Sequence, residues 1–118
     1  MIFAIDFDGT IVEHEYPEIG PEIPGAVNTL KDLQAKGHKI IIYTCRVAPR
    51  LAPIVEWFEM RGFRPDAINR NVVRRHKPGY AKIMANVYID DRNFPPFPGW
   101  EMVRQTFLPE TAPRFAEG

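Results

Sequence analysis

The chain has 118 residues, of which 45% are hydrophobic and 25% are charged, and its formal net charge is zero. Such a composition indicates one globular domain, and the lack of net charge excludes a general attraction to nucleic acid or anionic lipid. There is no signal-peptide pattern at the start, no apolar run long enough to cross a membrane, and only one cysteine, Cys45. We therefore expect a cytoplasmic protein without disulfides.

The predicted strands and helices alternate along the chain. Short apolar runs without polar alternation predict strands that are covered on both faces, and residues three and four apart share an apolar face in the predicted helices. We expect strands at 1–5, 39–43, 66–68 and 87–89, and helices from Pro24 to Gly37 and over 50–61, the second with Leu51, Ile54, Val55 and Phe58 on its buried side. This order predicts an α/β fold: a flavodoxin-like, doubly wound, mainly parallel sheet with helices on both faces and a minimal cap.

The last part of the chain differs in character from the rest. Residues 93–118 are rich in proline and aromatic side chains, and 100–107 are predicted to form one short helix. We expect a core of residues 1–92 and a C-terminal segment that packs on the core or on an oligomer partner. Exposed aromatic residues and an uncapped site are compatible with a homo-oligomer.

Polar side chains follow three of the predicted strands. Asp6 and Asp8 stand at the end of the first strand, Thr44 follows the second, and Asp90 with Asp91 follows the last. Ligands bind beyond the carboxyl ends of the strands in open parallel sheets, so we expect these groups to converge on one crevice. Because the chain leaves the first strand near Phe7, Asp6 and Asp8 are both expected to point into it.

This cluster suits phosphoryl transfer with Mg²⁺. Close carboxylates repel each other unless a cation neutralises them, and Mg²⁺ prefers carboxylate oxygens together with substrate phosphate. One carboxylate then attacks phosphorus, a second carboxyl group transfers the proton, and a threonine and a lysine contact the phosphoryl group. Gly9 allows the backbone to approach the phosphate closely.

The motifs Asp6-Phe7-Asp8-Gly9-Thr10, Ile41–Thr44 and Lys82–Asp91 occur in the order found in one known family. The chain resembles the haloacid dehalogenase superfamily of phosphohydrolases over residues 1 to about 92, and is similar to its small members without a cap domain. The resemblance implies that Asp6 is the nucleophile and Asp8 the acid/base. It also implies that Thr44 binds the phosphoryl group and that Lys82, with Lys77 as the alternative, is the motif lysine.

The same resemblance implies the ligands of a metal ion. Mg²⁺ would be held by Asp6, Asp90 and the backbone carbonyl of Asp8, with Asp91 as a further ligand or as an orienting residue. Further candidates for substrate contacts are Gly9, Thr10, Arg46 and Lys77.

We therefore expect a Mg²⁺-dependent phosphatase that acts on a small phosphorylated substrate, such as a sugar phosphate or a nucleotide. The presence of Asp8 favours phosphate ester hydrolysis within this family. Two alternatives are a phospho-receiver-like signalling module, which orders its acidic residues differently along the chain, and an inactive binding protein. The basic run from Arg70 to Lys77 contains no aromatic residue for base stacking, so no nucleic acid partner is expected, and no membrane partner either.

Overall fold

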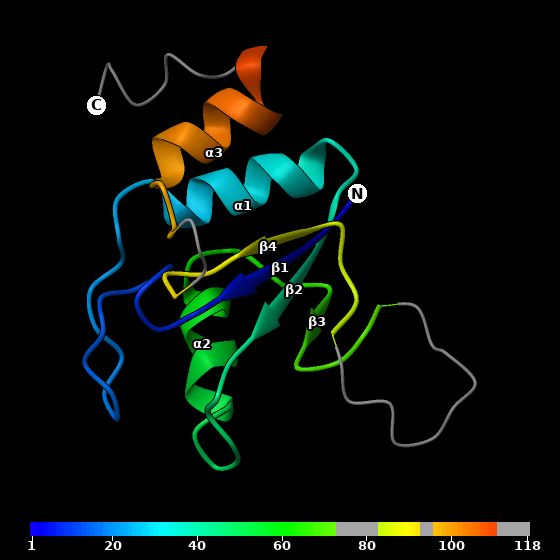
Figure 1. Ribbon diagram of the computed structural model, residues 1–118. Coiled ribbons are helices and arrows are strands. Elements are labelled where there is room, and N and C mark those ends of the chain that lie inside the picture. Colours follow the sequence, from blue (N-terminus) through cyan, green and yellow to red (C-terminus); the bar gives the residue numbers. More distant parts are fainter. Residues whose placement is uncertain (73–82, 93–95, 111–118) are drawn as a thin grey trace.

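A computed structural model describes residues 1–72, 83–92 and 96–110 of the chain (Figure 1). Its centre is a four-stranded sheet in the order β3-β2-β1-β4, in which every pairing is parallel. The strands are β1 (Ile2–Asp6), β2 (Lys39–Tyr43), β3 (Ala67–Ile68) and β4 (Val87–Ile89). The predicted flavodoxin-like α/β class is confirmed.

Helices cover both faces of this sheet. The described residues form α1 (Ala26–Ala35), α2 (Ala52–Met60) and α3 (Trp100–Phe107), and Figure 1 shows α1 and α3 on one face with α2 on the other. Phe3, Ile5, Ile40 and Ile42 of the two central strands are completely buried. Helices on both sides explain why these strands are apolar without alternation.

The strand order places the ends of β1 and β4 at a topological switch point. From β1 the sheet grows through β2 to β3 on one side, and the chain then returns to add β4 on the other side of β1 (Figure 1). In this class of sheet the crevice for a ligand lies at such a reversal. Ile5 pairs with Ile89, so the next residues, Asp6 and Asp90, leave neighbouring strands at the same level.

The buried face of α2 differs from the predicted one. Ile54, Trp57 and Phe58 are its buried residues, whereas the side chain of Val55 is 40% exposed. Successive helix residues are rotated by about 100°, so the stripe that includes position 57 turns position 55 toward solvent. Val55 was assigned wrongly because it lies four residues after Leu51, a spacing that predicted a shared face.

The C-terminal helix begins and ends where it was predicted, and it packs on the core. Trp100 is 2% exposed, and its indole Nε1–H donates a hydrogen bond of 2.9 Å to the carbonyl oxygen of Thr10. At the other end of α3, the ring of Phe107 meets Phe3 edge to face at 4.9 Å. None of the helices in 1–72, 83–92 and 96–110 is long and apolar enough to cross a membrane.

The hydrogen bond from Trp100 yields a test of the role of α3 in stability. Trp100→Phe removes the indole N–H and leaves a buried carbonyl without this donor, so the free energy of unfolding should fall by about 1–3 kcal/mol. Met102→Leu, at a position on the same helix that is 49% exposed, should change it by less than about 0.5 kcal/mol. Urea denaturation of both variants measures the difference, and equal stabilities would contradict the packing described for Trp100.

Candidate functional site

Three carboxylates meet where β1 and β4 end. Asp6 is the last residue of β1, and Asp90 and Asp91 directly follow β4. One carboxylate oxygen of each residue lies within 4.8 Å of the corresponding oxygens of the other two. The side chains are half-buried, so water screens their mutual repulsion only in part.

The electrostatics of this carboxylate cluster differ from one member to the next. Burial, followed by the negative charges of Asp90 and Asp91, raises the pKa of Asp6 from 3.8 to about 7. Burial alone would raise the pKa of Asp90 too. Hydrogen bonds to its carboxylate from the Tyr43 hydroxyl (2.5 Å) and the Arg92 backbone N–H (2.9 Å) outweigh that effect and lower the pKa. Asp90 is therefore anionic near neutral pH, whereas Asp6 is partly protonated without a cation.

The donor set and this charge balance fit Mg²⁺. The cluster offers only hard carboxylate oxygens, which are the ligands that Mg²⁺ prefers. Burial is the larger cause of the raised pKa of Asp6, and a cation among the three groups would offset the second cause, the repulsion by Asp90 and Asp91. Asp6, Asp90 and Asp91 are thus the described residues that could hold a metal ion.

The turn after β1 is built to approach this cluster. Gly9 has φ +88°, and a Cβ atom there would lie 2.3 Å from Oδ2 of Asp91. The hydroxyl of Thr10 donates to Asp6 (3.4 Å) and accepts a hydrogen bond from the backbone N–H of Asp91 (3.1 Å). The residues predicted to contact substrate at this turn therefore also connect the ends of β1 and β4.

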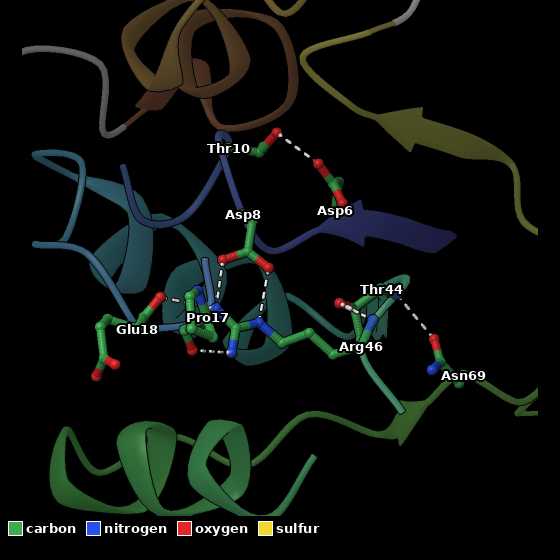
Figure 2. Close-up of polar contacts among 8 residues, drawn as sticks. All are labelled: Asp6, Asp8, Thr10, Pro17, Glu18, Thr44, Arg46 and Asn69. Atoms are coloured by element: carbon green, nitrogen blue, oxygen red, sulfur yellow. Dashed lines mark hydrogen bonds and ion pairs between the residues drawn. The ribbon is translucent and has the colours of Figure 1, made fainter. Parts of the chain in front are cut away.

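Asp8 lies in different surroundings from Asp6. Figure 2 shows the two side chains pointing apart, Asp6 toward Thr10 and Asp8 toward Arg46. Both oxygens of Asp8 accept hydrogen bonds of 2.8 Å from the Arg46 guanidinium. Asp8 still borders the same pocket as Asp6, but its carboxylate is outside the carboxylate cluster of Asp6, Asp90 and Asp91.

Thr44 stands at the carboxyl end of β2 and is held by two neighbours. Its backbone N–H donates to Oδ1 of Asn69 (2.8 Å), and its hydroxyl accepts from the backbone N–H of Arg46 (3.0 Å) (Figure 2). Asn69 and Tyr43 were not predicted as site residues. A signal was present, since Asn69 directly follows β3 as Thr44 follows β2.

The predicted site residues converge to a large extent. Asp6, Asp8, Thr44, Arg46 and Asp90 all border one pocket of about 370 Å³. This is within the usual volume of small-molecule sites. Lys77 and Lys82, between which the motif lysine was left open, lie outside the described residues.

A larger groove of about 460 Å³ lies between β4 and α3. Its walls are mostly apolar, with Val87, Phe97, Val103 and Phe107 among them. Perturbed titratable groups and converging polar side chains mark functional pockets better than volume does. We therefore place the candidate site at the smaller pocket with the carboxylates.

The raised pKa of Asp6 predicts how stability depends on pH when no metal ion is present. The pKa of Asp6 is about 7 in the folded chain and 3.8 without the effects of folding, so between these pH values the folded state binds more protons than the unfolded state. The unfolding free energy should therefore fall by about 1–2 kcal/mol as the pH rises from about 4 to about 7, less than the full shift implies because water around the half-buried Asp6 weakens the effect. Denaturation in EDTA measures this slope. Asp6→Asn should flatten it, and an unchanged slope in that variant would contradict the assignment.

The close approach of Gly9 to Asp91 gives a second prediction, with Gly37 as a matched control. Both glycines have positive φ, but a Cβ at Gly37 would meet nothing within 4 Å. Each alanine variant should lose about 1–2 kcal/mol through backbone strain. Only Gly9→Ala should also displace Asp91 and abolish the rise in melting temperature expected on adding MgCl₂. An equal rise in both variants would mean that Asp91 does not contribute to cation binding.

Comparison with known proteins places this fold among solved structures. No family model matches the chain, and no curated protein matches it. A solved structure of a conserved protein from Bacteroides thetaiotaomicron superposes with a TM-score of 0.85 at 41% sequence identity, covering 93% of this chain and 91% of that chain. The chain therefore belongs to the same family as this conserved Bacteroides thetaiotaomicron protein.

Proposed function

We propose that the protein is a Mg²⁺-dependent phosphatase that hydrolyses a phosphate monoester of a small metabolite through an aspartyl-phosphate. The observation that carries this proposal is the meeting of Asp6, Asp90 and Asp91, with carboxylate oxygens within 4.8 Å of one another. Asp8 and Thr44 border the same pocket. The resemblance to the haloacid dehalogenase superfamily supports the same reading.

The three clustered carboxylates and the backbone carbonyl of Asp8 are the proposed ligands of Mg²⁺. The bound ion would neutralise the cluster and withdraw electron density from the phosphoryl group. Asp6 then has to serve both as a ligand and as the nucleophile. The Thr10 hydroxyl forms hydrogen bonds with both Asp6 and Asp91 and so keeps the Asp6 carboxylate next to Asp91.

The reaction follows two displacement steps at phosphorus. An oxygen of Asp6 forms a bond to phosphorus while the bond to the leaving oxygen breaks. Asp8, which has to take up a proton before this step, gives that proton to the leaving oxygen. Water then attacks the aspartyl-phosphate, Asp8 takes the proton, and Asp6 is released together with inorganic phosphate. The hydroxyl of Thr44 donates to a phosphoryl oxygen. Lys82 or Lys77 supplies the positive charge that contacts the phosphoryl group.

Sugar phosphates and nucleotides are the substrate classes that we propose. The pocket of about 370 Å³ is of a size for a small metabolite, and His14, Tyr16 and Arg92 border it in addition to the carboxylates. These side chains offer hydrogen bonds, an aromatic face and a positive charge for the part of the substrate beyond the phosphate.

The activity is tested with p-nitrophenyl phosphate and the purified protein. Turnover should require Mg²⁺ and stop on addition of EDTA. Asp6→Asn should lower kcat by at least about 10³-fold because the nucleophile is lost. Glu56→Gln, an exposed acidic position on α2, should leave kcat unchanged and controls for the loss of one negative charge.

Other results of these assays would contradict the role of Asp6 or favour one of the two alternative functions. A substantial residual rate in Asp6→Asn would reject Asp6 as the nucleophile. Stable phosphorylation of Asp6 by a small phosphodonor without turnover would favour a receiver-like module. A wild-type protein that neither binds Mg²⁺ nor hydrolyses phosphate esters would favour the inactive binding protein.

A further inference from the structure

Arg46 is a buried arginine at the edge of the proposed site. It is 3% exposed, and its guanidinium donates hydrogen bonds to both oxygens of Asp8 and to the carbonyl oxygens of Pro17 and Glu18 (Figure 2). We propose that Arg46 is a positioning residue that fixes the Asp8 carboxylate for proton transfer and does not bind the phosphate of the substrate. This inference rests on the proposed phosphatase function.

The hydrogen bonds of Arg46 are already directed at protein acceptors. Nε and Nη2 each donate to one Asp8 oxygen at 2.8 Å, while Nη1 donates to Pro17 (3.0 Å) and Nη2 also to Glu18 (2.9 Å). The guanidinium lies 5.0 Å from the centre of the Tyr16 ring. A substrate phosphate could recruit this group only by breaking a buried, bidentate ion pair, which is costly because Asp8 would be left uncompensated.

The planar guanidinium also determines where the Asp8 carboxylate lies. Two parallel N–H···O bonds fix both the position and the plane of a carboxylate, which a single ammonium group does not do. The backbone N–H of Arg46 donates to the hydroxyl of Thr44 as well. One residue therefore sets the relative positions of the acid/base group, the phosphate-binding threonine and the loop that carries Tyr16.

The pairing divides the four carboxylates of the site into two groups. Asp6, Asp90 and Asp91 form the cluster that suits a cation, while the charge of Asp8 is balanced by Arg46. The Asp8 carboxylate thus borders the pocket but is not one of the carboxylates proposed to hold the metal ion. When a reacting group is misplaced by about 1 Å, the reaction rate can fall by roughly 10²-fold. We therefore expect a substitution of Arg46 to change kcat more than KM.

The experiment compares Arg46→Lys with Arg50→Lys. Arg50 also lies over the Tyr16 ring, at 5.5 Å, but it is exposed and makes no ion pair with Asp8 in the described structure. With saturating Mg²⁺ and p-nitrophenyl phosphate, Arg46→Lys should lower kcat by about 10–100-fold and change KM by less than about threefold. Arg50→Lys should retain the wild-type kcat. Thermal melts establish that each variant is folded at the assay temperature.

A double-mutant cycle distinguishes positioning from a general structural role. If Arg46 acts through Asp8, then Arg46→Lys should lower kcat by less than about twofold in an Asp8→Asn background. A structural role would reduce kcat by the same factor in both backgrounds, and losses that multiply would overturn the proposal. So would a rise in KM of more than about tenfold with unchanged kcat, because that is the result expected of a substrate-binding arginine.

Asp8→Glu provides the second variant if Arg46→Lys is too unstable to assay. The side chain is then longer by about 1.5 Å, one carbon–carbon bond, so the carboxylate and the guanidinium can no longer both keep their native positions. The proposal expects a lower kcat with unchanged KM and melting temperature, and full activity would overturn it. A wild-type protein without activity, or an Asp6→Asn variant that keeps its activity, would contradict the phosphatase function itself. Loss of activity in Asp6→Asn together with wild-type kcat in Arg46→Lys would contradict only the positioning role of Arg46.

Discussion

Repulsion between carboxylates at the carboxyl edge of the sheet is the constraint on which the site depends. Asp6, Asp90 and Asp91 bring oxygens within 4.8 Å of one another in a half-buried place, and Asp8 stands two residues from the first of them. Burying like charges this closely destabilises a fold unless each charge is compensated. Burial, followed by the charges of Asp90 and Asp91, raises the pKa of Asp6, and charge compensation within the cluster does not offset these two effects.

The compensation that is present comes from different parts of the chain. Arg46 neutralises Asp8, and the hydroxyl of Tyr43 donates to Asp90. Thr10 spans the remaining pair by donating to Asp6 and accepting from the backbone of Asp91. The remaining groups are carboxylate oxygens with excess negative charge, an arrangement that a divalent cation could stabilise.

A rigid apolar sheet holds these charges at close range. β1 lies between β2 and β4, and Phe3, Ala4 and Ile5 are completely buried beneath Asp6. Dense packing resists the relaxation that repulsion would otherwise cause. The C-terminal helix adds to this support, because Trp100 donates a hydrogen bond to Thr10 in the turn beside the cluster. The C-terminal segment, which differs from the rest of the chain in composition, is thus joined to the edge of the sheet that carries the carboxylates.

Much of the fold, and the strand-end positions of Asp6, Thr44 and Asp90, could be read from the sequence. Local patterns suffice for these, since apolar runs, helical spacing and glycine stops act over a few residues. Tertiary structure decided which face of α2 is buried and how α3 packs. It also decided that Asp8 pairs with Arg46 while Asp6 joins the carboxylate cluster. Those outcomes depend on contacts between segments far apart in sequence: the guanidinium is 38 residues from the carboxylate it holds. Spacing along the chain does not determine the direction of a side chain at a turn, because its partners there come from other strands and loops.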